Sequence, residues 1–225
     1  MPYVIIELIN LICGKYLNSM EILVNSATCY KNDNLIFNDI NLALKNSDIA
    51  LISGSNGSGK TTLIKSICGI QSLESGSVLI NDIDIQNKNS TYVENIIYVG
   101  HKNSLNNDLT VYENLEYLSA LDLSIKYNNK VKIEEAMRYF DIYKYKDYPV
   151  ENLSEGNKKK TSLARLVMTE KKIWILDEPL SFLDDKSIDI FINLISKNQE
   201  NKGITILSSH IDLSKNIEKV KHLRM

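Results

Sequence analysis

The stretch LISGSNGSGKTTLI, residues Leu51 to Ile64, decides the fold. It fits the pattern GxxxxGK[ST], which begins at Gly54 and ends at Thr61, and it stands between an apolar run and a helical pattern. Glycines let the backbone turn its amide groups onto phosphate oxygens, and a helix that begins here adds the positive end of its dipole. The stretch therefore predicts a loop that binds nucleotide phosphates. A Gly/Ser-rich turn that only caps a helix is the disfavoured alternative.

Two side chains of this loop supply specific chemistry. Lys60 places a positive charge at the β- and γ-phosphates, and the Thr61 hydroxyl is a hard oxygen ligand for Mg²⁺. The pattern does not name the reaction, because kinases, GTPases and motor ATPases share such a loop. We expect the nucleotide-binding residues here to be Gly54, Ser55, Asn56, Gly57, Ser58, Gly59, Lys60, Thr61 and Thr62.

The composition limits the class of protein. With 225 residues, 44% of them hydrophobic, and a formal net charge of -2, the chain resembles a soluble protein of one domain that can bury a core. The near-neutral charge argues against nucleic-acid binding, which usually requires a strongly basic face. Cys13, Cys29 and Cys68 form no CxxC pair, so neither a disulfide framework nor a zinc site is expected. The apolar segment near the start is interrupted by Glu7 and is shorter than the roughly 20 residues that span a bilayer. We therefore expect a cytoplasmic chain without a membrane span of its own.

Short apolar runs and helical patterns alternate along the chain. Continuous apolar runs, typical of central strands that are covered on both faces, occur in DIALIS, KIWIL and GITILSS. Helical patterns occur in KTTLIKSICGI, VKIEEAMRYF and TSLARLVM. Thr110 and Glu113 have the spacing of a capping box that begins a helix. Together these patterns predict an α/β sheet core with an inserted α-helical subdomain at about residues 100–160.

Two acids follow the apolar run KKIWIL. Asp177, at the tip of a buried strand, can hold Mg²⁺ through its water shell, and Glu178 beside it can polarise an attacking water. Paired acids at the end of a strand are often only solvated. Because a phosphate loop is also present, we interpret this pair as catalytic.

The stretch LSEGNKKKTSLARL adds a second anion site. Ser154 and Gly156 stand at the start of a predicted helix, where a hydroxyl and free backbone amides can bind an anion. Lys158, Lys159 and Lys160 follow in the first turn and oppose the helix dipole, unless an acidic neighbour or a phosphate compensates. We expect at least two of these three lysines to form a solvated basic face.

The order of these motifs resembles the nucleotide-binding subunits of ABC transporters. The resemblance rests on GSNGSGKTT, LSEGN, WILDE, SFLD and His210 in LSSH, and it covers about residues 20–215. It implies a P-loop NTPase fold of the ABC type, with a RecA-like core, an antiparallel β subdomain and an inserted α-helical subdomain, in an ATP-binding domain at residues 20–225. It also implies ATP and Mg²⁺ as cofactors, with Thr61 and Asp177 as Mg²⁺ ligands. Residues 1–19 lie outside it, as an N-terminal extension that is either a short appended helix or the result of a start site assigned too far upstream.

The resemblance further implies roles for particular residues. Two domains would form a homodimer head to tail, so that Ser154 and Gly156 of one chain close over the γ-phosphate bound to the other. Glu178 would be the catalytic base, and His210 would contact the γ-phosphate. Asp184, at the end of SFLD, would couple the two sites.

Some positions depart from the family pattern or have two interpretations. Tyr30 falls where the family keeps an aromatic residue that stacks on adenine, and burial among the strands is the alternative left open. Glu155 and Asn157 replace the third and fifth residues of the usual signature LSGGQ, at positions that vary across the family. His101 stands where most members have a glutamine that contacts Mg²⁺ and the attacking water. Because Mg²⁺ prefers oxygen ligands, we expect His101 to act through water or at the surface that meets a membrane subunit.

Within the family, local stretches look most like the ATP-binding subunits of cytochrome c maturation systems, the haem exporters. These stretches are YVGHKNSLNNDLTVYENL, KKTSLARL, KKIWILDEPLSFLD and ILSSHIDL. The likeness implies a peripheral protein on the cytoplasmic face of the inner membrane, bound to an integral membrane permease, that couples ATP hydrolysis to c-type cytochrome biogenesis. One alternative is the ATP-binding subunit of another small exporter, of lipoproteins or small solutes. Another is a soluble P-loop ATPase without a membrane partner.

Overall fold

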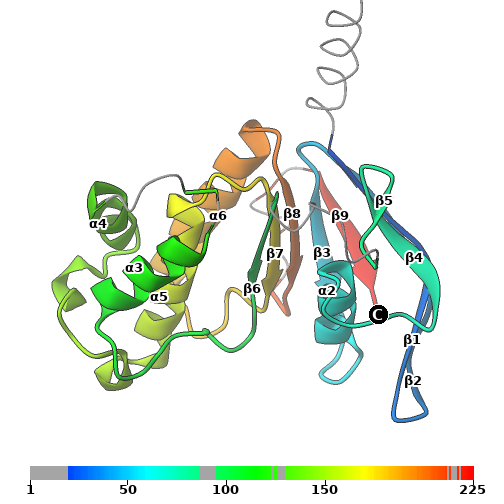
Figure 1. Cartoon of the computed structure of the whole chain (residues 1–225), viewed down its shortest axis with the longest axis horizontal. Coiled ribbons are helices and arrows are strands. Elements are labelled where there is room, and N and C mark those ends of the chain that lie inside the picture. The colour runs from blue at the N-terminus through cyan, green and yellow to red at the C-terminus, as the bar shows by residue number, and fades with distance from the viewer. Residues whose placement is uncertain are drawn as a thin grey trace, which may run out of the picture.

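The computed structural model describes residues 20–86, 95–122, 124–125, 130–211, 213, 217 and 219–225. Within them the chain forms a parallel sheet that lies between an antiparallel sheet and a group of helices (Figure 1). This mixed arrangement confirms the predicted α/β fold with its antiparallel β subdomain. The N-terminal extension expected at residues 1–19 lies outside the described part of the chain.

The parallel sheet leads into the phosphate loop. Its strands are β3 (Ile49–Ser53), β6 (Ile96–Val99), β7 (Ile173–Asp177), β8 (Ile204–Ser208) and β9 (Val220–Arg224). Their order is β6-β7-β8-β3-β9, and every pairing is parallel. Every residue of β7 and of β8 is buried, which is why their sequences are apolar runs without alternation. The order also brings the ends of β7 and β8 side by side, next to the end of β3.

The antiparallel sheet is built largely from the first described segment. Its strands are β1 (Glu21–Lys31), β2 (Asn34–Lys45), β4 (Ser75–Ile80) and β5 (Ile83–Asp84), in the order β2-β1-β4-β5. Asn32 and Asp33 join β1 to β2 with φ of 49° and 62°. Asparagine and aspartate tolerate this left-handed conformation, so the tight hairpin turn costs little strain.

Helices cover both faces of the parallel sheet. They are α2 (Lys60–Ile67), α3 (Val111–Leu121), α4 (Lys130–Tyr139), α5 (Glu155–Met168) and α6 (Asp185–Glu200), with short 3-10 turns η2 (Tyr143–Tyr145) and η3 (Val150–Asn152). α5 packs against both α3 and α4 and links them to the sheet. No helix within the described residues is both long and apolar enough to cross a membrane.

Two hydrophobic clusters lie on opposite faces of the parallel sheet. Along β3, Ile49 and Leu51 face the cluster that includes the helices α3 to α6, whereas Ala50 and Ile52 face the cluster that includes α2 and the antiparallel sheet. Because successive side chains of a strand point to opposite faces, both clusters must be apolar to hold this strand. The phosphate loop thus starts from a strand fixed on both sides.

Thr110 caps α3, as its spacing to Glu113 predicts. The Thr110 hydroxyl accepts a hydrogen bond from the Glu113 amide at 3.2 Å, and the Glu113 carboxylate accepts one from the Thr110 amide at 2.8 Å. We expect Thr110→Ala to lower the free energy of unfolding by about 1 kcal/mol, because it leaves an amide of the first turn unpaired. Urea denaturation measures this change, with Thr110→Ser as the control that keeps the hydroxyl. Equal stability of Thr110→Ala and the parent would contradict the prediction.

Candidate functional site

The phosphate loop runs from the end of β3 to the start of α2. Gly59 is the N-cap of α2 at a φ of 98°, and a Cβ atom placed there would lie 2.7 Å from the Ile36 side chain. Both the positive φ and the close approach exclude a larger residue. The loop therefore holds its backbone amides at the N-terminus of a helix, where they can bind an anion.

Lys60 is held over this loop. Its ammonium donates hydrogen bonds to the carbonyls of Gly54 at 2.9 Å and Ser55 at 3.1 Å, and it lies 3.9 Å from the Glu178 carboxylate. Only 7% of Lys60 is exposed. A buried ammonium close to a helix N-terminus gives the loop a positive charge suited to phosphate groups.

Asp177 ends β7 as a buried carboxylate that is 1% exposed. One of its oxygens accepts hydrogen bonds from the Ser208 hydroxyl at 2.8 Å and the Thr61 hydroxyl at 3.2 Å. The other oxygen is buried and has no hydrogen-bond partner among the described residues. A buried carboxylate oxygen without a partner is costly, and a cation or its water shell would satisfy it.

These residues fit Mg²⁺. The described part of the chain contains no cluster of three or more His, Cys, Asp or Glu side chains that could hold a metal ion. Mg²⁺ is usually bound by few protein oxygens and keeps waters and substrate phosphates as its other ligands. The Thr61 hydroxyl beside the unpaired oxygen of Asp177 is a donor set of this kind.

Glu178 stands directly after β7 in a left-handed conformation, with a φ of 49°. Its amide donates a hydrogen bond to the Ser208 hydroxyl at 2.9 Å, and its carboxylate lies 3.3 Å from Nε2 of His210. A non-glycine residue at positive φ is strained, and such strain persists where the surroundings fix it. Here Ser208 fixes the backbone, and the Glu178 carboxylate is turned toward Lys60 and His210.

The charge of Asp177 affects groups behind the site. Burial and the nearby Asp177 carboxylate raise the pKa of the Cys68 thiol to about 12. The same causes raise the pKa of the Tyr98 phenol to about 12. Both groups therefore remain neutral near pH 7, and neither supplies a nucleophile to the site.

A cavity of about 620 Å³ opens in front of these residues. Its wall is formed by the phosphate loop, by residues that follow the C-terminal ends of β7 and β8, and by the loop after β6. The lining residues are Lys31, Ile36, Asn56, Gly57, Gly59, Lys60, Thr61, Thr62, His101, Glu178, Ser181 and His210. The structure thus brings His101, Glu178 and His210 to the cavity that the phosphate loop lines.

Tyr30 does not line this cavity. It lies on β1 with 46% of its surface exposed, so the alternative of burial among the strands is wrong. Lys31 and Ile36 of the same hairpin line the cavity instead. Stacking of Tyr30 on adenine stays a prediction.

The signature residues lie at the start of α5, away from the cavity of their own chain. Ser154 is exposed and is the N-cap of α5, accepting a hydrogen bond from the Asn157 amide at 3.3 Å. A Cβ atom on Gly156 would lie 2.7 Å from the carbonyl oxygen of Phe182. The helix start and the segment after Glu178 are therefore in close contact within one chain.

Asp184 caps α6 and does not reach the cavity of its own chain. It accepts hydrogen bonds from the amide of Ser187 at 2.9 Å and from the Ser187 hydroxyl, and it pairs with Lys160 at 3.3 Å. These hydrogen bonds, above all those from Ser187, and the Lys160 ammonium lower the pKa of Asp184 to about 2. Asp184 therefore keeps its negative charge at the pH of a cell.

The expectation that at least two of the three lysines form a solvated basic face is wrong. Lys158 pairs with Glu155 at 3.1 Å and Lys160 pairs with Asp184 at 3.3 Å, and Lys159 is only 1% exposed. The acidic neighbours offset the unfavourable position of the two paired lysines at a helix N-terminus.

Ser208 was not identified from the sequence as a residue of the site. The available signal was a hydroxyl side chain in LSSH, at the end of a buried strand.

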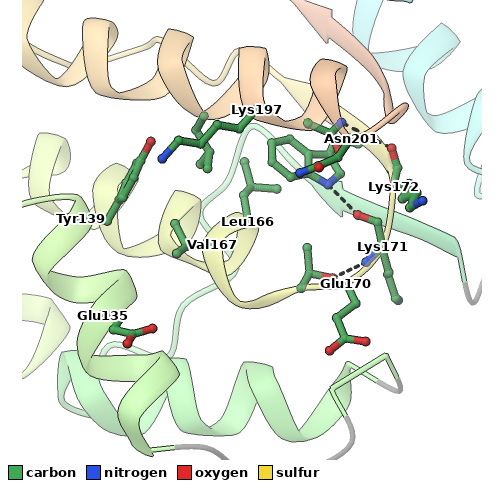
Figure 2. A pocket seen from close by; sticks show the side chains of 13 residues that line it. Glu135, Tyr139, Leu166, Val167, Glu170, Lys171, Lys172, Lys197 and Asn201 are labelled. Atoms are coloured by element: carbon green, nitrogen blue, oxygen red, sulfur yellow. Dashed lines mark hydrogen bonds between the residues drawn. The ribbon is translucent and has the colours of Figure 1, made fainter. Parts of the chain in front are cut away.

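A second cavity of about 530 Å³ lies between the C-terminal ends of α5 and α6, beside Tyr139 of α4 (Figure 2). Its buried polar groups are satisfied within the protein. The Trp174 indole donates to the Lys171 carbonyl at 2.8 Å, and the Asn198 amide donates to the hydroxyl of Thr205 at 3.1 Å. None of its lining residues has a buried side-chain oxygen or nitrogen without a partner. The second cavity therefore offers no group that requires a ligand.

Known proteins resemble the chain over most of its length. A family model described as ABC transporter matches residues 37–181. The cytochrome c biogenesis ATP-binding export protein CcmA of Histophilus somni (strain 129Pt) is 34% identical over 200 residues, which covers 86% of this chain and 88% of that protein. The protein of the same name from Pasteurella multocida (strain Pm70) is 30% identical over 207 residues, which covers 90% of this chain and 95% of that protein.

Solved structures share the fold. A putative ABC transporter ATP-binding protein from Pyrococcus furiosus superposes with a TM-score of 0.77 at 23% identity, covering 90% of this chain and 97% of that one. An ATP-binding cassette, solved as a dimer in a post-hydrolysis state bound to ADP and Pi, superposes with a TM-score of 0.74 at 20% identity, covering 84% and 88%. Together with the family match and the geometry of the phosphate loop, these likenesses lead to one assignment. The chain belongs to the ABC transporter family, carries its ATP-binding domain and is an ATPase.

Proposed function

We propose that the chain is the ATP-hydrolysing subunit of an ABC exporter complex for c-type cytochrome biogenesis. The observation that carries this proposal is the likeness to proteins named CcmA, at 30–34% identity and nearly full coverage of both chains. Glu178 supports the hydrolytic part of this proposal, because a subunit that only bound nucleotide would not need an acid beside Asp177.

Hydrolysis would use the groups already described. The Thr61 hydroxyl and Asp177 would hold Mg²⁺, which neutralises negative charge on the phosphates when it is bound. The Lys60 ammonium would bind the phosphate groups once it leaves the carbonyls of its own loop. The Glu178 carboxylate would accept a proton from the attacking water, and His210, 3.3 Å away, would orient that carboxylate and contact the γ-phosphate.

A second copy of the chain would complete each site. Ser154 and Gly156 lie outside the cavity of their own chain, although an exposed hydroxyl and free amides at a helix N-terminus can bind an anion. In a head-to-tail homodimer, these groups would close over the nucleotide of the partner. Asp184, which is tied to the same helix through Lys160, would then link the two sites.

The membrane partner would be an integral permease, and the chain would sit on the cytoplasmic face of the inner membrane. Affinity purification from gently solubilised membranes tests this point. We expect an integral membrane protein to be recovered with the chain. Its absence would instead favour an ATPase without a membrane partner.

A genetic experiment tests the cargo pathway. A bacterium that lacks its own CcmA should regain covalent haem attachment to c-type cytochromes when it expresses this chain together with the permease that this chain binds. Haem staining of denaturing gels measures the attachment, and the Glu178→Gln variant is the matched control, which should restore nothing. Recovery of a membrane partner without restored haem attachment would favour a lipoprotein or small-solute exporter.

His101 is proposed to act as a polar relay between the nucleotide site and the surface that meets the permease. It is exposed and lines the nucleotide cavity. We expect His101→Gln to retain ATPase activity, whereas His101→Ala should lower kcat about tenfold, the effect of one lost hydrogen bond. Phosphate release, measured with and without the permease, checks both variants. Full activity of His101→Ala both with and without the permease would contradict a role of His101 in hydrolysis or in coupling to the permease.

A further inference from the structure

Lys159 is a buried lysine whose role the ATPase mechanism does not explain. It lies early in α5, is 1% exposed, and its ammonium donates a hydrogen bond to the backbone carbonyl of His101 at 3.4 Å. Its neighbours in sequence, Lys158 and Lys160, instead pair with carboxylates. No salt bridge joins Lys159 to a carboxylate within the described residues.

The electrostatic surroundings of Lys159 point toward the nucleotide site. Burial lowers the pKa of its ammonium, while the carboxylates of Asp177, Glu178 and Glu155 act in the opposite direction. Burying a lysine without a paired carboxylate is unfavourable, so an apolar side chain of similar length would stabilise this position better. Stability alone therefore gives no reason for a lysine here.

The contact of Lys159 joins two separate parts of the site. His101 belongs to the loop that follows β6, and Lys159 belongs to the helix that carries the signature. A cavity of about 580 Å³ lies beside the contact, lined on one side by residues 101–105 and Asn107 and on the other by Glu155, Lys158 and Lys159. Since His101 also lines the nucleotide cavity, the residue that Lys159 contacts is shared by the two cavities.

We propose that Lys159 is a positioning residue that fastens the His101 loop to the signature helix through the His101 carbonyl. When the helix moves, the loop moves with it, so the position of His101 at the nucleotide depends on the position of α5. This coupling lies within one chain and requires neither the permease nor the proposed role in cytochrome c biogenesis.

Limited trypsin digestion of the full chain tests the contact directly. Lys102 is exposed and follows His101, so cleavage after Lys102 reports how firmly the loop is held. We expect Lys159→Met to raise the rate of this cleavage about tenfold, which corresponds to one lost hydrogen bond. Cleavage at other sites should stay unchanged, and the melting temperature should stay equal or rise.

Matched variants separate the contact from other effects. Lys159→Arg keeps a charged donor, and the adjoining cavity leaves room for it, so it should retain slow cleavage at Lys102. Lys197→Met, an exposed lysine of α6, is the control for loss of a lysine. Where Lys159→Met does not fold, Lys159→Gln replaces it, because its side chain is polar but too short to reach the carbonyl.

Kinetics give an independent measurement. We expect Lys159→Met to lower kcat for ATP hydrolysis and to leave KM for ATP within about twofold, since the phosphate loop is untouched. Unchanged cleavage at Lys102 in a folded Lys159→Met variant would overturn the proposal. Equal acceleration of cleavage at every site, with a lower melting temperature, would also overturn it by indicating a general structural role. Digestion needs no nucleotide, so these outcomes are independent of the test of the transport function.

Discussion

Glu178→Gln is expected to lower kcat for ATP hydrolysis by about 10²–10⁴-fold, the usual contribution of a general base. Glutamine keeps the shape of the side chain but cannot accept a proton from water. The backbone of residue 178 is held by Ser208 at 2.9 Å, so the substitution should leave the site in place. ATP should still bind, because the phosphate loop and Lys60 are unchanged, and the closed dimer should accumulate.

Phosphate release measures hydrolysis, and fluorescence measures nucleotide binding. Size-exclusion chromatography in the presence of ATP measures accumulation of the dimer. Glu170→Gln is the matched control, since the Glu170 side chain is 58% exposed and pairs with Lys132 away from the site. Hydrolysis at the parent rate by Glu178→Gln would remove Glu178 as the base. Loss of ATP binding would instead indicate that the substitution distorts the phosphate loop.

Ser154→Arg is expected to lower hydrolysis by at least about 10²-fold, the effect of removing one hydrogen-bond donor to developing charge. The bulky arginine would stand where the signature meets the nucleotide of the partner chain. Binding of ATP to the phosphate loop should be retained, because Ser154 lies outside the cavity of its own chain. Ser154→Ala is the comparison variant: it removes the same hydroxyl and the cap of α5, at a cost of about 1 kcal/mol, but adds no bulk, so it separates loss of the donor from obstruction by the arginine.

Mixing two inactive variants gives the sharper form of this test. A dimer of one Ser154→Arg chain and one Glu178→Gln chain has both defects in one site and neither in the other. If each site is built from two chains, the mixture should regain hydrolysis that neither variant shows alone. If mixing restores nothing although mixed dimers form, the signature does not act on the partner's nucleotide.

The elements that were predictable from sequence are those with a local cause. The phosphate loop has a fixed spacing between a strand and a helix, the continuous apolar runs follow from a sheet covered on both faces, and Thr110 with Glu113 forms a capping box within a single turn. Each of these features can be read from a short window of sequence. The order of the five motifs then indicated the family.

What escaped prediction depends on contacts between distant segments. Ser208 binds Asp177 only because β8 lies beside β7 in the sheet. Lys159 is buried because the loop after β6 folds back over α5, although its two neighbours are lysines in the same helical turn. The exposure of Tyr30 depends on how the first hairpin, whose Ile36 side chain lies close to Gly59, packs against the phosphate loop. None of these facts is present in a local pattern, since each requires the packing of separate elements.

The contact of Gly156 with the Phe182 carbonyl and the pairing of Lys160 with Asp184 have a consequence for a whole transporter. In one chain they join the signature surface, which is proposed to face the partner's nucleotide, to the segment that follows Glu178, the proposed catalytic base. In a head-to-tail dimer of such chains, the closing of one nucleotide site would therefore favour the closing of the other. ATP hydrolysis should therefore rise sigmoidally with ATP concentration, because ATP bound in one site would favour closure of the other.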